Sequence, residues 1–438
     1  MTIKQILFII SLAITLGVFA YSTYRIIQFF RLTKAGFPIR DIGQRLKITW
    51  NVAIAQSKIM RNKIAGFFHA MVFWGFILIT IGSVEMVFDG VFGTERLFSV
   101  LGPVYDIIIG LGDFFAMFIL FSMFVFLARR LFLNISRFKG VEMEKKSKWD
   151  ANIALTFIIL LMVSLLGMNM AYVALHPSEF QGVYPVSEAM AGWFGGMSLS
   201  QIHTVHEASW WSHILLIFIF ANILPYSKHF HVFMSVPNVF LSRLKPMGYI
   251  YNMETITKEV KMMMDPNADF SAAEDEGEEP ERFGAKDVED LSWKNYFDAL
   301  SCTECGRCTA VCPANITGKL LSPRKIMVDT RARMKEKGPG LVKDSNYDDG
   351  KSLLGDYISE EELWACTMCN ACVQECPINI HQPSIILELR RYLVMEKASA
   401  PSELNTMFTN VENNGAPFQY SQEDRMKWAE ELKANSEF

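Results

Sequence analysis

The sequence predicts an all-α protein, in which five transmembrane helices precede a helical domain that carries every cysteine of the chain. Hydrophobic residues make up 51% of the 438 residues, which is too apolar for an ordinary soluble protein. Long apolar stretches fill the first part of the chain, whereas the remainder is polar. All eight cysteines lie in two short runs near the C-terminal end.

Five apolar stretches reach the length of about 20 residues that a helix needs to cross a bilayer. The first has no small-residue cleavage site and four others follow it, so we interpret it as a retained helix rather than a signal peptide. The predicted spans are residues 4–24, 64–84, 104–128, 152–175 and 209–233.

The loops between the spans predict an orientation. Two loops are rich in lysine and arginine: Arg25, Arg31, Lys34, Arg40, Arg45, Lys47, Lys58, Arg61 and Lys63 follow span one, and Arg129, Arg130, Arg137, Lys139, Lys145, Lys146 and Lys148 follow span three. The other two loops are mainly acidic, with Arg96 as their single base. The positive-inside rule then puts the N-terminus outside and the cysteine domain in the cytoplasm, as expected for a protein of the bacterial inner membrane.

The cysteines form two copies of one pattern, C-x-x-C-x-x-C-x-x-x-C-P. This is the ligand run of two [4Fe–4S] clusters, and in two-cluster ferredoxins the fourth cysteine of each run binds the other cluster. We therefore predict the following two sets of ligands: Cys302, Cys305, Cys308 and Cys376 for cluster 1, and Cys366, Cys369, Cys372 and Cys312 for cluster 2.

Zinc sites and disulfides are the alternatives for these cysteines. Zinc sites usually use two separated C-x-x-C pairs rather than a run of four cysteines. Disulfides need an oxidising compartment, which disagrees with the cytoplasmic placement. The pattern therefore favours one-electron chemistry on iron–sulfur clusters.

Seven of the eight histidines lie in the membrane half, where ionisable groups are costly and usually functional. His69 and His231 lie at similar depths near the cytoplasmic ends of spans two and five, so we predict that they bind haem b. His213 precedes His231 by five helical turns, about 27 Å along a continuous helix. A second haem at His213 stays an alternative, because span two has Ile79 rather than histidine at the matching depth.

Other polar residues of the membrane half have two interpretations each. His176, His203 and His206, beside the outer ends of spans four and five, are either interfacial side chains or part of a quinone pocket or second haem site. Asp113, inside span three, either handles protons at a quinone site or is tied to a neighbouring hydroxyl group. His229 is the weaker haem ligand. The catalytic residues are unknown, and the quinone-site candidates are Asp113, His213 and His206.

The predicted domains are a membrane domain at residues 1–245, an acidic linker at 246–290, a ferredoxin domain at 291–400 and a polar tail at 401–438. The segment between the cysteine runs contains charged stretches with helical patterns, which favours a helical ferredoxin domain. No nucleotide- or flavin-binding motif is present, and we expect no nucleic acid partner.

The membrane half resembles the gamma subunit of respiratory nitrate reductase, a five-helix di-haem cytochrome b. The resemblance rests on Phe68–His69, on His213 and His231, which are 18 positions apart, and on the segments Pro225–His231 and Val232–Pro237. It implies that His69 and His231 bind one haem, while a second haem would use His213 and the position that Ile79 occupies here.

The C-terminal half resembles the Fe–S subunits of heterodisulfide reductase-type and glycolate oxidase-type enzymes. The whole chain is similar to membrane Fe–S oxidoreductases of the heterodisulfide reductase-like family, some of which link electron-transfer flavoprotein to menaquinone. This implies an electron-transfer subunit of a quinone oxidoreductase, partnered by electron-transfer flavoprotein or by a CCG-domain subunit. The alternatives are a membrane anchor or Fe–S redox sensor without quinone turnover, and a quinol oxidase subunit like that of nitrate reductase.

Overall fold

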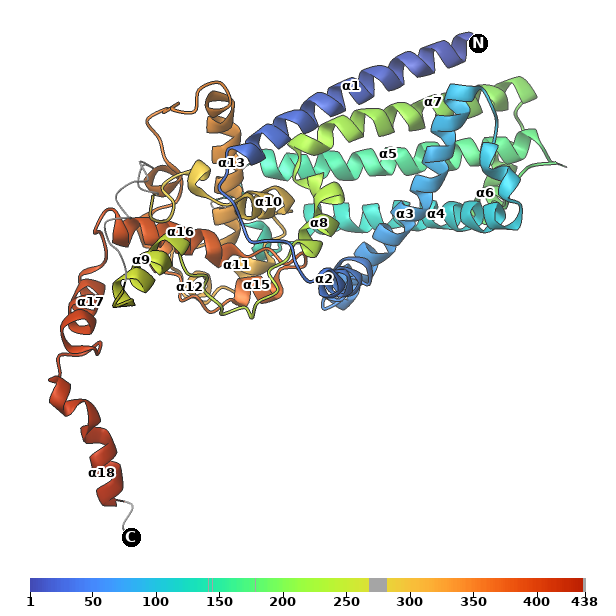
Figure 1. The fold of residues 1–438 in the computed structure, drawn as a ribbon. Helices are drawn as coiled ribbons and strands as arrows, with labels where there is room; N and C mark the ends of the chain where they lie inside the picture. Colours follow the sequence, from blue (N-terminus) through green and yellow to red (C-terminus); the bar gives the residue numbers. More distant parts are fainter. Residues whose placement is uncertain (141, 144, 178, 268–281, 436–438) are drawn as a thin grey trace. The chain divides into compact units, whose positions relative to one another are not determined.

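The protein is helical, and its five longest helices are apolar (Figure 1). The computed structural model describes residues 1–140, 142–143, 145–177, 179–267 and 282–435, and no β-strand occurs among them. Each of the five helices is long and apolar enough to cross a membrane. They are α1 (Ile3–Arg31), α3 (Lys63–Phe92), α4 (Pro103–Phe132), α5 (Lys145–Leu175) and α7 (Leu199–Ile223).

Shorter helices connect the long helices and build the rest of the protein. In the membrane half these are α2 (Ile42–Ile48), the π-helix η1 (Thr49–Ile54), α6 (Pro185–Met190), α8 (His231–Phe240) and the 3₁₀ turns η2 (Leu97–Leu101), η3 (Ser136–Phe138), η4 (Ala191–Phe194), η5 (Leu224–Tyr226) and η6 (Lys228–Phe230). Later come α9 (Glu254–Met264), η8 (Val288–Asp290), α10 (Trp293–Ser301), α11 (Arg307–Ala310), α12 (Pro313–Ile316), α13 (Pro323–Leu341), η9 (Leu353–Tyr357), α14 (Glu360–Trp364), α15 (Ala371–Glu375), α16 (Gln382–Met395), α17 (Ser402–Asn414), η10 (Gln422–Met426) and α18 (Lys427–Asn435).

Side chains at the N-termini explain where several long helices begin. Thr2 and Ser198 form capping boxes with Gln5 and Gln201, which satisfy backbone N–H groups that have no partner inside the helix. Asn62 caps α3 in a similar way. The cap at Ser198 starts α7 ten residues before the predicted start of span five, so His203 and His206 lie on this helix rather than in a loop.

The prediction of one continuous helix over residues 209–233 is wrong at its C-terminal end. α7 ends at Ile223, two 3₁₀ turns follow, and His231 begins a new helix, α8. Pro225 lacks an N–H group and Ser227 has an extended backbone, so the helical hydrogen-bond ladder cannot continue. His213 and His231 therefore do not lie on one face of one straight helix.

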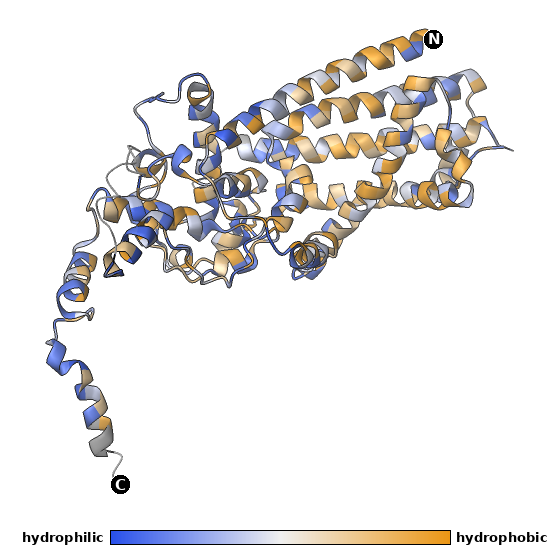
Figure 2. Cartoon of the chain, viewed as in Figure 1, coloured by the Kyte–Doolittle hydropathy of each residue, from blue (hydrophilic) through white to orange (hydrophobic). Residues whose placement is uncertain are grey.

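The bundle buries several polar groups and an apolar core, and it also exposes many large apolar side chains, as a lipid environment allows. One buried cluster joins α1, α3, α5 and α7 through Phe8, Met86, Met168, Trp210, Ile214 and Phe218. The Oγ of Ser22 on α1 lies 2.9 Å from the Tyr226 hydroxyl beyond α7. Large apolar side chains on the outside include Ile14, Ile107 and Phe121, each more than half exposed. Figure 2 shows that hydrophobic residues, drawn in orange, predominate along the five long helices.

The cysteine-bearing segments belong to the same compact unit as the membrane helices. The chain divides into two units, Met1–Tyr251 with Asp287–Ile385, and Asn252–Lys286 with Ile386–Phe438. Within the first unit, Phe30 of α1 packs on Tyr296 of α10, with 4.9 Å between ring centroids. Arg324 of α13 binds Glu142 after α4, with its Nε 2.8 Å from Oε1. These contacts join the membrane helices to the cysteine-bearing segments within the first unit.

The second unit consists of α9, part of α16, α17, η10 and α18. Its segments are joined by backbone and side-chain bonds, since the Phe283 N–H donates to Glu396 and the Ala285 N–H to the carbonyl oxygen of Glu388. The predicted acidic linker includes helix α9, and its residues 268–281 lie outside the described residues. The predicted polar tail forms helices α17 and α18.

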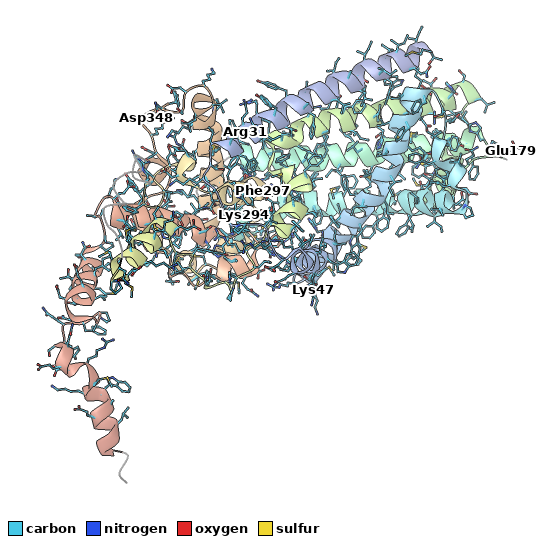
Figure 3. The ribbon with its side chains drawn as sticks, in the orientation of Figure 1. Arg31, Lys47, Glu179, Lys294, Phe297 and Asp348 are labelled. Carbon is cyan, nitrogen blue, oxygen red and sulfur yellow. The ribbon has the colours of Figure 1, made fainter. Side chains whose placement is uncertain are left out.

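A buried carboxylate, Asp287, organises the cysteine-bearing part of the first unit. It accepts hydrogen bonds from Arg333 and Lys337 of α13 and from the Leu353 N–H. We expect Asp287→Asn to lower the free energy of unfolding by about 3 kcal/mol, because two buried cations lose their common anion. Urea unfolding in detergent would measure this loss. The exposed Asp348 (Figure 3) provides the control, and equal stability of D287N and D348N would contradict the prediction.

The same carboxylate makes stability depend on pH in the acid range. Burial by itself raises the pKa of Asp287, but the hydrogen bonds and charges of Arg333 and Lys337 outweigh it and lower the pKa overall. The unfolded chain therefore binds this proton more tightly than the folded chain. The stabilisation is present above the ordinary aspartate value of about 3.9 and is lost as the pH falls below it.

Candidate metal centres

Both cysteine runs form loops with the same backbone conformation. In the first run, Glu304 and Gly306 have φ values of 57° and 74°. At the corresponding positions of the second run, Met368 and Asn370 have values of 54° and 60°. Glycine and asparagine are the residues that adopt this left-handed conformation most readily. The repeated strain curls each loop so that its first three cysteines surround one space.

The first space is lined by the four cysteines that we predicted for cluster 1. A small pocket has Cys302, Cys305, Cys308 and Cys376 in its wall. Cys305 and Cys302 are also the cysteines whose charges act most strongly on Cys376. The fold thus brings the last cysteine of the second run to the first three cysteines of the first run.

The thiols of the second set also lie near one another, since three of them help to raise the pKa of the fourth. The charges of Cys366, Cys312 and Cys369 act on Cys372. The two sets adjoin, because Cys308 and Cys372 pack in one cluster with Val373. None of the eight cysteines forms a disulfide. Two four-thiol sets in contact match the ligand requirement of two neighbouring [4Fe–4S] clusters.

Burial shapes the chemistry of these thiols. It raises the pKa of Cys302 to about 11, and those of Cys372 and Cys376 to about 12. Buried thiols of this kind give up their protons when a metal replaces them. The Ile380 N–H also donates to the Sγ atom of Cys376 over 3.3 Å, and such bonds tune cluster potentials. The donor set therefore fits iron–sulfur clusters.

The two predicted haem ligands lie close together at the end of the bundle that meets the cysteine loops. Burial, together with the neighbouring rings of His229 and His69, lowers the pKa of His231 to about 3. The Nδ1 atom of His69 lies 3.0 Å from Gln56 Oε1, and that of His231 lies 3.4 Å from the Lys228 carbonyl oxygen. Metal-binding histidines usually donate one ring N–H to such an oxygen, which leaves the other nitrogen for the metal. The residues present therefore fit a haem between the two rings.

Each of these histidines is linked to the loops of the first cysteine set. Lys58, two residues after Gln56, donates to the carbonyl oxygen of Cys376 over 3.2 Å. Lys228 pairs with Glu304, which lies between Cys302 and Cys305 in the sequence, with 3.5 Å between Nζ and Oε2. Ser147 Oγ accepts a further bond from Lys228 over 2.8 Å. Short bonded segments thus connect both sides of the histidine pair to one cluster set.

His213 is buried in the middle of the bundle. Its Nδ1 lies 2.9 Å from the Leu161 carbonyl oxygen, and its Nε2 has no hydrogen-bond partner among the described residues. An unpartnered buried nitrogen requires an explanation, and a bound metal is one of them. Ile79 packs against the apolar cluster that contains Leu161, so α3 offers no second ligand from that position.

Asp113 is accounted for by the structure of the bundle. It accepts hydrogen bonds from the Val186 and Ser187 N–H groups at 2.8 and 2.9 Å and from the Ser187 hydroxyl. It also accepts one from Asn169. A carboxylate from α4 thus caps the N-terminus of α6, where a negative charge is favourable. Of the two interpretations of Asp113, these bonds favour the one in which its carboxylate is tied to a neighbouring hydroxyl group, that of Ser187.

The other histidines lie apart from this pair. His206 and His176 both lie beside the Tyr172 ring, with centroid distances of 6.3 and 4.9 Å, on the early part of α7 and the end of α5. Among the described residues no hydrogen bond joins any two of Asp113, His206 and His213. The three quinone-site candidates therefore do not form one bonded cluster.

Several residues around the candidate centres are not predicted from the sequence. From the sequence, Lys58 is noticed only as one residue of a basic loop. Gln56, Lys228 and Glu304 are not singled out. The position of Glu304 inside the first cysteine run, and that of Lys228 inside the motif before His231, are the signals that could have identified them. Their partners, however, are far away in the sequence.

The cysteine-bearing region is similar to a known protein family. Residues 294–377 match a family described as a 4Fe-4S dicluster domain. The match spans both cysteine runs and the helices between them, so it supports iron–sulfur clusters as cofactors.

Three relatives are named as oxidoreductases or as a subunit of one. The chain is 28% identical to the "Probable iron-sulfur-binding oxidoreductase FadF" of Bacillus subtilis, over 98% of this chain and 61% of the relative. It is 28% identical to the EtfAB:quinone oxidoreductase of Syntrophomonas wolfei, over 95% and 58%. It is 36% identical to one of the subunits of a CoB-CoM heterodisulfide reductase of Methanosarcina acetivorans, over 24% and 52%.

The chain spans about three fifths of the length of the first two of these relatives. No solved structure matches the chain. The dicluster match and the five apolar helices together indicate an iron–sulfur protein with helices that could cross a membrane, and the relatives are consistent with electron transfer.

Proposed function

We propose that the protein is an electron-transfer subunit of a membrane quinone oxidoreductase. Electrons would pass between a redox partner in the cytoplasm, the two [4Fe–4S] clusters, haem b and the quinone pool. The observation that carries this proposal is the pair of links from His69 and His231 to the loops of one cysteine set, through Lys58 and through Lys228. A membrane anchor has no need for this connection.

The residues have distinct roles in this proposal. Cys302, Cys305, Cys308 and Cys376 hold cluster 1, and Cys366, Cys369, Cys372 and Cys312 hold cluster 2. His69 and His231 hold haem b, which supplies one-electron redox chemistry when bound. Gln56 and the Lys228 carbonyl group orient the two imidazoles. A second haem at His213 is the remaining alternative for the unpartnered Nε2.

The orientation follows from the basic segments. The segments that follow α1 and α4 contact the cysteine loops, because Lys58 donates to the Cys376 carbonyl oxygen and the Arg137 carbonyl oxygen lies close beside Gly306 of the first run. These are the segments that the positive-inside rule assigns to the cytoplasm. The clusters would therefore face the cytoplasm, and the N-terminus would lie outside.

The partner and the substrate are proposed from the relatives. One relative is named as an oxidoreductase that links EtfAB with quinone, so we propose electron-transfer flavoprotein, or a CCG-domain subunit, as the partner of this chain. Menaquinone or ubiquinone is the proposed membrane substrate. His206 and Asp113 are not joined to His213 by a bond, so the quinone site is not assigned to particular residues.

A reduced-minus-oxidised optical spectrum of the purified full chain, with haem and iron measured per chain, tests the proposal. We expect a b-type α band with one haem per chain, and about eight irons in two clusters. Oxidation of the dithionite-reduced haem by a menaquinone analogue completes the test. Eight irons without haem would overturn the electron conduit and leave an anchor or redox sensor.

A further inference from the structure

A pocket rich in arginine lies where α3 and α4 meet the cysteine loops. It has a volume of about 390 Å³, and its lining residues are Arg61, Asn62, Arg137, Arg307, Ala310, Val311 and Glu375. Three guanidinium groups and one carboxylate give it a net positive charge. Neither the clusters nor the histidine pair accounts for it, although Arg307 also lines the pocket of the first cysteine set.

Most of the polar groups of this pocket are held in place by the protein. Arg307 donates to the carbonyl oxygens of Lys58 and Ile59 over 2.9 and 3.3 Å. Arg61 donates to the Gln374 carbonyl oxygen over 3.0 Å. Glu375 lies 3.5 Å from Arg61 and 4.0 Å from Arg307, so this one carboxylate is shared by two cations.

Arg137 differs from the other two arginines. Its guanidinium lies over the Phe138 ring, 5.4 Å from the centroid, and it has no hydrogen bond or ion pair within the described part of the chain. The side chain is half-buried. Burial, with the charges of Arg129 and Arg307, lowers its pKa. An anion in the pocket would reduce the electrostatic repulsion among these cations.

The surroundings of the pocket point to a lipid. Arg61 and Asn62 immediately precede α3, and Arg137 follows the end of α4 by five residues, so the pocket lies at the ends of two membrane-spanning helices. The two helices pack together there, with 6.4 Å between the ring centroids of Phe68 and Phe126. Close to the pocket in sequence, Ile64 on the first turn of α3 and Phe132 at the end of α4 are 76% and 82% exposed. An anionic head group would find guanidinium groups beside an apolar surface that suits acyl chains.

We propose that this pocket binds the phosphate group of an anionic phospholipid from the leaflet that faces the cysteine loops. Arg137 and Arg61 would donate to the phosphate oxygens, since guanidinium groups form paired hydrogen bonds with phosphate. A free phosphate ion presents the same chemistry, but it would leave the apolar surface of α3 and α4 unused. The proposal requires that α3 and α4 span a bilayer, and it does not depend on haem or on the redox partner.

Lipid retention by the purified full chain in detergent tests the proposal, with native mass spectrometry as the readout. We expect bound cardiolipin on the wild-type chain, and about tenfold weaker binding in Arg137→Gln, because one charge-assisted contact is lost. Glu375→Gln should instead strengthen the binding, since it releases two guanidinium groups from their carboxylate. A damaged fold would not produce tighter binding.

Three comparisons separate this site from other sources of binding. Arg31→Gln is the matched control, because Arg31 is exposed at the end of α1 and lines no part of the pocket (Figure 3). Equal losses in R31Q and R137Q would overturn the proposal in favour of diffuse attraction to basic loops. Equal retention of phosphatidylcholine would show that charge has no role. Displacement of cardiolipin by an excess of inorganic phosphate would identify a free anion as the ligand.

Discussion

Replacing His231 by alanine is expected to remove haem b from the protein while its iron–sulfur clusters remain. The haem content should fall from about one per chain to near zero, whereas about eight cluster irons should stay. The physical reason is that His231 lies near His69 and that the Lys228 carbonyl oxygen holds its Nδ1, which leaves the other ring nitrogen for a metal. The reduced-minus-oxidised spectrum and an iron assay on the same sample measure both quantities.

His229 supplies the matched control for this experiment. Its ring lies 5.9 Å from that of His231, and its Nδ1 is 3.1 Å from Ser227 Oγ and 3.8 Å from Asp150. Because the proposal places the haem between His69 and His231 and gives His229 no ligand role, His229→Ala should keep its haem. Equal haem contents in the two variants would show that His231 is not the ligand.

A pair of double variants is expected to show that the two cysteine runs exchange their fourth ligands. Cys302→Ser with Cys376→Ser should remove one cluster and leave about four irons, because both residues belong to one set. Cys302→Ser with Cys312→Ser should remove both clusters and leave almost no iron. The reason is that Cys376 lies with Cys302 and Cys305, whereas Cys312 acts on Cys372.

Iron analysis and electron paramagnetic resonance of the reduced variants measure this difference. If each run bound its own cluster, the C302S/C312S variant would retain four irons and the C302S/C376S variant would lose all of them. The two arrangements therefore give opposite results, and each double variant serves as the control for the other.

These two experiments also examine the route between the centres. Cys376 contributes a thiol to the first set and a carbonyl oxygen that binds Lys58. Lys228 contributes a carbonyl oxygen to His231 and an ammonium group to Glu304. If the route is real, loss of the cluster held by Cys376 should also block reduction of haem b by the partner, even though His69 and His231 are unchanged.

The sequence by itself determined the elements whose signal is local. Apolar length alone predicts a membrane-spanning helix, because the bilayer has a fixed thickness, and each of the five predicted spans overlaps a long apolar helix. The spacing and number of the cysteines likewise indicated the class of cofactor, and the match to a dicluster family supports that interpretation. Helix ends were less accurate, since caps such as Ser198 and the break near Pro225 shift them by several residues.

The tertiary structure decided what depends on contacts between distant parts of the chain. Whether Asp113 binds protons or caps a helix depends on Val186 and Ser187, more than 70 positions away, and no local pattern contains that information. The same holds for Lys228 with Glu304 and for the arginine pocket, whose lining comes from four separate segments. Side chains that carry charge are satisfied by whichever partner the fold brings to them, so their roles follow from packing rather than from spacing.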